Sequence, residues 1–114
     1  MAKTADVLTN MWVDRDRCLA NIHAQKGLVM AEKVMIELVD HGVARDEAHE
    51  VMREASFEAV ANGEELIDVC SRTPAIAAAF SAEELEAMFN PLNHGGVAGE
   101  IVDECVALAR EAIQ

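Results

Sequence analysis

The loop at 90–96 gathers the side chains best suited to contact a ligand. It contains two asparagines, one histidine and two glycines, and it directly precedes a predicted helix. Flexible glycine backbone, amide side chains and a helix N-terminus can together bind an anion or line a pocket. An ordinary connection between two helices would use the same residue types, so both interpretations stay open.

The other residues with reactive side chains show no catalytic or metal-binding spacing. The four histidines form neither H-E-x-x-H nor another zinc pattern. The three cysteines, Cys18, Cys70 and Cys105, are far apart and lack a C-x-x-C pair, which predicts reduced thiols and no disulfide or metal site. Each cysteine lies in a predicted helix, where we expect it to be a small buried apolar side chain.

Composition excludes several classes of protein. The 114 residues include 9 Lys+Arg and 21 Asp+Glu, for a net charge of −12, which excludes a general nucleic-acid binder. Hydrophobic residues make up 52% and charged residues 26%, which excludes intrinsic disorder. No apolar run reaches the ~20 residues of a membrane span, and the N-terminus lacks a signal-peptide core. We therefore expect a cytoplasmic, acidic, globular protein with neither a nucleic-acid nor a membrane partner.

The acidic residues are concentrated in the second half of the chain. Residues 1–53 contain seven basic and nine acidic residues, whereas residues 54–114 contain two basic and twelve acidic residues. We interpret the acidic half as a solvated surface.

The pattern of apolar residues predicts helices throughout. Aromatic residues are only 4% and tyrosine is absent, which favours small side chains and closely packed helices. No segment shows the alternation of a strand. We predict an all-α fold, a compact bundle of about six or seven helices. The helical segments are 1–11, 14–21, 28–41, 45–62, 64–71, a helix opened at 73–74, 81–89 and 97–113.

The sequence also predicts where helices begin and end. The 28–41 helix is apolar over more than half of its circumference, so we expect burial from more than one side. Three signals indicate helix starts: Asp14 as an N-cap, Thr73-Pro74 as a hydroxyl followed by proline, and Ser81 with Glu84 as a capping box. Phe80 and Leu85 flank this box as a hydrophobic staple. Gly42 and Gly63 indicate helix ends.

Six short blocks occur along the chain in a set order. They are Arg17-Cys-Leu-Ala-Asn21, Gly27-Leu-Val-Met-Ala-Glu-Lys-Val34, Arg45-Asp-Glu-Ala-His49, Phe80-Ser-Ala-Glu-Glu-Leu85, Phe89-Asn-Pro91 and Gly99-Glu-Ile-Val-Asp103. Together they resemble the C-terminal domain of the adenylosuccinate lyase family, in the fumarase/aspartase superfamily. The resemblance runs from about Ala5 to Leu108. It rests on the order and spacing of the blocks, since each block is short.

The resemblance implies that this sequence is a fragment. Residues 1–12 resemble the end of a long central-domain helix, and residues 13–114 the helical C-terminal domain. Family members are homotetramers whose active sites combine three subunits, and their catalytic loop precedes this region. No G-S-S-x-M-P-x-K stretch occurs here, so we expect no catalytic residue and no activity from this fragment alone.

The resemblance also implies a reaction for the full-length enzyme. That enzyme would release fumarate from adenylosuccinate and from succinyl-carboxamide ribotide in purine biosynthesis, by acid–base β-elimination without a cofactor. Its partners would be the rest of the lyase chain, the other subunits and the nucleotide substrate. Lys33, Asn90, Asn93 and His94 are our candidates for facing the active-site mouth. The family usually has a tyrosine shortly after the position of Pro91, which is absent here.

Two alternatives remain. The blocks at 47–49 and 96–103 look more like the related 3-carboxy-cis,cis-muconate cycloisomerase, whereas 81–85 and 89–91 look more like adenylosuccinate lyase. A free-standing helical dimerisation or binding module would use the apolar 28–39 segment to pair with another chain.

Overall fold

The computed structural model describes residues 2–113, and every regular element in that range is helical. The elements are α1 (Ala2–Asn10), α2 (Arg15–His23), the 3-10 turn η1 (Leu28–Met30), α3 (Ala31–Asp40), α4 (Arg45–Asn62), α5 (Leu66–Arg72), α6 (Pro74–Ala79), α7 (Ala82–Phe89), the 3-10 turn η2 (Pro91–His94) and α8 (Ala98–Ile113). The all-α prediction is confirmed, with eight α-helices in the described range. No helix in residues 2–113 is both long and apolar enough to cross a membrane.

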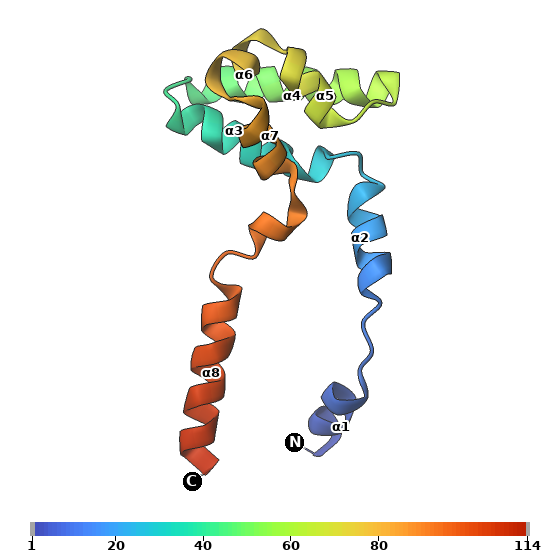
Figure 1. Ribbon diagram of the computed structural model, residues 1–114, viewed down its shortest axis with the longest axis vertical. Coiled ribbons are helices and arrows are strands. Elements are labelled where there is room, and N and C mark those ends of the chain that lie inside the picture. The colour runs from blue at the N-terminus through green and yellow to red at the C-terminus, as the bar shows by residue number, and fades with distance from the viewer. Residues whose placement is uncertain (1, 114) are drawn as a thin grey trace.

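Helices α3 to α7 form a compact head at one end of the molecule (Figure 1). Helix α3 packs on α4, and α5 contacts α4, α6 and α7. The core is made of apolar side chains that these helices turn inward. Its buried members are Val34, Leu38, Ala48, Met52, Ala55, Ala59, Leu66, Val69, Cys70, Ile76, Phe80, Leu85 and Met88.

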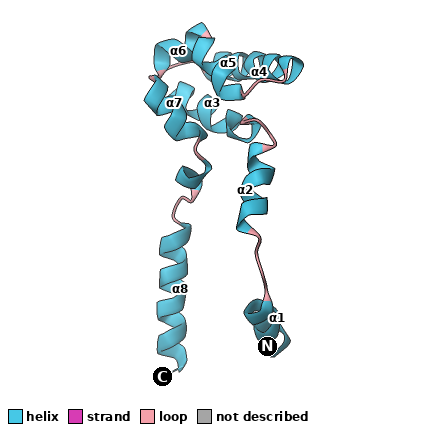
Figure 2. Ribbon diagram, turned by 45° about the vertical axis from the view of Figure 1, so that its right-hand side comes forward, coloured by secondary structure: helices cyan, strands magenta, loops and turns pink. Residues whose placement is uncertain are grey.

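Two arms extend from the same side of this head, as Figures 1 and 2 show. One arm, residues 2–23, contains α1 and α2, and the other is α8; none of these three helices buries a residue. The radius of gyration is 19.2 Å, against about 13 Å for a compact domain of this length. The compact packing that the sequence predicts is therefore found in the head, α3 to α7. The assignment of residues 1–12 to a preceding domain stays a prediction, and Met1 lies outside the described residues.

The predicted glycine stops and the capping box are confirmed. Gly42 and Gly63 have φ of 92° and 67°, the left-handed conformation that ends a helix. The Ser81 backbone N–H donates to Glu84 Oε2 at 2.7 Å, and the Glu84 N–H donates to Ser81 Oγ at 3.2 Å. Asp14 also caps α2, since its Oδ1 accepts from the Arg17 N–H at 2.9 Å.

Two predicted helix starts differ from the structure. Thr73 precedes α6 but does not cap it, because its hydroxyl donates backward to the Val69 carbonyl at 2.8 Å and so closes α5. Pro74 still begins α6. The predicted 28–41 helix is divided, with a 3-10 turn at Leu28–Met30 before α3 begins at Ala31.

Just before this 3-10 turn lies the junction at Lys26 and Gly27, where the arm meets the head. Both residues have positive φ, 49° and 79°. The Lys26 carbonyl accepts from the Leu66 N–H at 2.9 Å, and its Nζ donates to the Gly63 carbonyl at 2.6 Å. A Cβ on Gly27 would lie 2.9 Å from the Phe89 ring. These contacts hold a left-handed backbone at Lys26 and Gly27, so α2 cannot continue as one helix into residues 28–40.

Gly27→Ala should lower the free energy of unfolding by about 3 kcal/mol, because it combines left-handed backbone with overpacking against Phe89. Gly42→Ala is the matched control, since Gly42 also has positive φ but a Cβ there would meet nothing within 4 Å. We expect it to cost about 1 kcal/mol. Urea unfolding of the two variants measures the difference, and equal losses would contradict the proposed contact.

Candidate functional site

The predicted ligand-binding loop is held against helix α7 by its own polar side chains. Asn93 Nδ2 donates to the Ala87 carbonyl at 2.9 Å. His94 Nε2 donates to the Met88 carbonyl at 2.7 Å. Both carbonyls belong to the last turn of α7, where helical backbone acceptors lack partners within the helix. The amide and the imidazole thus complete the C-terminal end of α7.

The other two predicted site residues also have partners close in sequence. Asn90 Oδ1 accepts from the Leu92 N–H at 3.0 Å, which begins η2. Lys33 forms an ion pair with Glu37, one turn further along α3. Within residues 2–113 no hydrogen bond or ion pair joins Lys33 to the 90–94 loop. A role in facing a substrate stays a prediction for all four residues.

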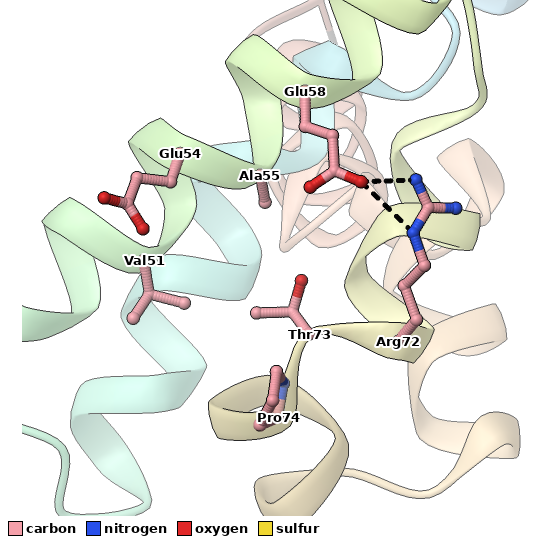
Figure 3. Close-up of a pocket in the computed structure, with 7 residues that line it drawn as sticks. All are labelled: Val51, Glu54, Ala55, Glu58, Arg72, Thr73 and Pro74. Carbon is pink, nitrogen blue, oxygen red and sulfur yellow. Dashed lines mark hydrogen bonds and ion pairs between the residues drawn. The ribbon is translucent and has the colours of Figure 1, made fainter.

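A cavity of about 340 Å³ lies between α4 and the α5–α6 junction (Figure 3). Its wall includes Glu54 and Glu58 from α4 and Arg72, Thr73 and Pro74 from the junction. Arg72 reaches across to α4, where its Nη2 donates to Glu58 Oε1 at 2.6 Å.

Arg72 also pairs with Glu64, which begins the loop between Gly63 and α5. The hydrogen bond from Arg72 lowers the pKa of Glu64, and the two carboxylates raise the pKa of Arg72. A guanidinium already shared by two carboxylates is poorly placed to bind a further anion. The arrangement therefore joins the end of α4 to α5. Sequence reasoning did not single out Arg72, although it is one of only two basic residues in 54–114.

A second groove of about 340 Å³ lies between α3 and α4. Met35 and Met52 line it, with His49 and Arg53 on the same side. Arg53 is occupied, because it pairs with Glu50 one turn away and its guanidinium carbon lies 5.5 Å from the Phe57 ring centroid. This groove presents apolar surface and no free cation from Arg53.

The three thiols differ in exposure. Cys70 is buried as predicted, and burial raises its pKa to about 12, so the thiol stays protonated and is a poor nucleophile. Cys18 and Cys105 are exposed, so the prediction of burial is wrong for both. The reason is that neither α2 nor α8 has a fully buried residue.

Two histidines, His41 and His94, form hydrogen bonds with backbone carbonyls. His41 Nδ1 donates to the Glu37 carbonyl at 2.9 Å. The His41 and Phe80 rings meet edge-on, with 4.8 Å between their centroids. Within residues 2–113 no group of three or more His, Cys, Asp or Glu side chains could hold a metal ion. The described site residues thus bind the protein's own backbone and helices.

Glu64→Gln should make stability less dependent on pH in the acidic range. Because Arg72 lowers the folded-state pKa of Glu64, the carboxylate stabilises the fold above its unfolded pKa of about 4.3, and this is lost as pH falls through the folded value. The free energy of unfolding of the unmodified chain should therefore fall more steeply between about pH 5 and pH 3 than that of the variant.

Chemical denaturation across this pH range is the measurement. Glu65→Gln is the control, because Glu65 forms no ion pair in the described part of the chain. Identical pH profiles for Glu64→Gln and the unmodified chain would contradict a stabilising ion pair.

Residues 27–105 match the family described as adenylosuccinate lyase C-terminus. Adenylosuccinate lyase of Methanocaldococcus jannaschii is 35% identical over 94 residues, which cover 82% of this chain and 20% of the relative. Adenylosuccinate lyase of Archaeoglobus fulgidus is 31% identical over all 114 residues, 26% of its own length. The 3-carboxy-cis,cis-muconate cycloisomerase of Acinetobacter baylyi is 34% identical over 112 residues, which cover 98% of this chain and 24% of the relative.

The chain spans about a fifth to a quarter of the length of these relatives. No solved structure matches it significantly. The family match begins at Gly27, the junction residue at which the arm meets the head, and ends within α8.

Proposed function

The chain belongs to the adenylosuccinate lyase C-terminal family, and from this membership we propose that it is the C-terminal part of an adenylosuccinate lyase. The complete enzyme would release fumarate from adenylosuccinate and from succinyl-carboxamide ribotide in purine biosynthesis. The observation that carries the proposal is the family match over residues 27–105, which includes the whole head.

In this proposal the chain is a non-catalytic part of the enzyme. The absence of activity is supported by the chemistry of the head, where Cys70 is protonated and buried and Arg72 is held between two carboxylates. Its partners are the rest of the lyase chain and the other subunits of a cytoplasmic homotetramer, and the substrate is a nucleotide. No metal or cofactor takes part.

The 90–94 loop would contribute to the mouth of the active site through its rigidity. Asn93 and His94 fix the loop to the carbonyls of α7, so its outer surface keeps a constant shape. Lys33 and Asn90 complete the set of residues that we propose to lie near the substrate.

A second candidate function is 3-carboxy-cis,cis-muconate cycloisomerization. It is favoured by the match to the Acinetobacter baylyi enzyme, whose identity of 34% is close to that of the archaeal lyases. The two functions differ in substrate and not in the role of this domain.

The full-length gene product should release fumarate from adenylosuccinate, whereas the 114-residue chain should show no turnover. Absorbance between about 240 and 280 nm follows fumarate release, because elimination creates a conjugated dicarboxylate, and it follows loss of 3-carboxymuconate, because ring closure removes its conjugated diene. Turnover of 3-carboxymuconate with none of adenylosuccinate would select the second candidate. Turnover by the short chain would contradict the non-catalytic role.

Replacing both Asn93 and His94 by Ala in the full-length enzyme should raise KM or lower kcat several-fold, because each loses one hydrogen bond worth about 1 kcal/mol that positions the loop. Steady-state kinetics on folded enzyme measure this effect. Glu86→Ala, at an exposed position of α7, is the control and should leave both constants unchanged. Unchanged kinetics in the double variant would leave the loop only a connecting role.

A further inference from the structure

Lys26 has a strained backbone conformation that glycine would adopt more easily. Its φ is 49°, and it is the only non-glycine residue with positive φ in residues 2–113. Left-handed backbone brings the Cβ of an L-residue too close to the following carbonyl oxygen, whereas glycine has no Cβ. Such strain persists only where the surrounding structure maintains it. The presence of lysine at this position therefore indicates a use for its side chain.

The Lys26 side chain supplies the positive charge that the C-terminal end of α4 lacks. Helix α4 has Asp46 and Glu47 in its first turn but no basic residue in its last turn. Lys26 Nζ donates to the carbonyl of Gly63, the residue that ends α4, at 2.6 Å. A cation at this end complements the helix dipole, and a charged donor makes a stronger hydrogen bond than a neutral one. Glycine at position 26 would remove the strain, but this bond would be lost with it.

The backbone of Lys26 joins the same point to α2 and to α5. Its N–H donates to the His23 carbonyl at 2.9 Å, so Lys26 belongs to the hydrogen-bonded turn that ends α2. Its carbonyl accepts from the N–H of Leu66, the first residue of α5, at 2.9 Å. The ammonium and the carbonyl of one residue thus hold both sides of the loop at 63–65. Two contacts resist rotation of the attached helix better than either contact alone.

We infer that Lys26 is a positioning residue whose ammonium group fixes the direction of α2 relative to the head. Apolar packing contributes little to this direction, because every residue of α2 except the half-buried Ile22 is exposed. Glu64 lines the same cavity of about 250 Å³ as Lys26, but Glu64 is paired with Arg72. The Lys26 ammonium is therefore bonded to the Gly63 carbonyl and not to this carboxylate.

For the lyase proposed above, a fixed α2 would keep the head in one orientation relative to the preceding part of the chain. This consequence rests on the proposed function. The inference about α2 itself does not, because it concerns hydrogen bonds within the 114-residue chain.

Pulsed electron–electron resonance between two nitroxide labels measures the direction of α2 in the whole 114-residue chain. One label is attached to Cys18 on α2, and the other to position 44, before α4, after Ala44→Cys. Both positions are exposed. Cys105→Ser removes the other exposed thiol, and the fully buried Cys70 stays. We expect one narrow distribution of distances in the chain that keeps Lys26.

Lys26→Met retains the alkyl chain and the strained backbone but cannot donate to Gly63, so the distribution should become at least twice as wide. Lys26→Arg retains a charged donor and should keep the distribution narrow. Gln25→Met is the matched control, because Gln25 is exposed and contributes only its backbone to the described hydrogen bonds. A wide distribution with Lys26 present, a narrow one for Lys26→Met, or equal widths for Lys26→Met and either Lys26→Arg or Gln25→Met would overturn the inference.

Lys26→Asn separates the direction of α2 from the stability of the head. Asparagine adopts left-handed backbone more readily than lysine, but its side chain is too short to replace Lys26 Nζ. Its urea unfolding midpoint should therefore lie above that of Lys26→Met, while its distance distribution stays as wide. Widths that followed the unfolding midpoint across the variants would overturn the inference. Neither measurement involves fumarate release, so the proposed function and this inference can fail separately.

Discussion

The close approach of α4 to its neighbours is the constraint on which the head depends. The inward face of α4 is formed by Ala48, Met52, Ala55 and Ala59, each no more than 4% exposed. Three of these four side chains are a single methyl group, so α3 and α5 can pack near the α4 backbone. Their larger residues, among them Leu38 and Leu66, are then fully buried beside it. A larger side chain on this face would separate helices that contribute most of the core.

The same constraint explains why the polar residues of the head are used structurally. A small core leaves helix ends near the surface, where their backbone groups need partners. Arg72, Asn93 and His94 each supply such a partner or join two segments. For this reason the polar side chains that the sequence offers as site residues form hydrogen bonds and ion pairs within the head itself.

The elements that local chemistry determines could be predicted from the sequence. Gly42 and Gly63 end helices because left-handed backbone suits glycine, and the Ser81–Glu84 box needs only residues three apart. The left-handed junction at Lys26 could not be predicted, because the Leu66 N–H that donates to its carbonyl is forty positions away in the sequence. The prediction that Cys105 is buried failed for a related reason. Periodicity identifies which face of a helix is apolar, but not whether another helix covers it.

The candidate site shows the same division. The 90–96 loop was identified from its residue types, yet its bonds to the α7 carbonyls depend on how the chain folds back. Arg72 carried almost no local signal, since its two carboxylate partners lie 14 and 8 residues earlier. Family membership supplied what neither the pattern nor the geometry could, namely the group of proteins to which residues 27–105 are related.

Gly95 and Gly96 separate α8 from the head, and a Cβ at either position would meet nothing within 4 Å. The cooperative folding unit is therefore shorter than the chain, because every core residue lies between Val34 and Met88. In the free chain, the amide hydrogens of α8 would exchange with solvent through local fraying, while those of α4 would exchange only when the whole head opens. The direction of α8, and the protection of its amide hydrogens from exchange, are therefore set by the surface on which α8 packs and not by the head.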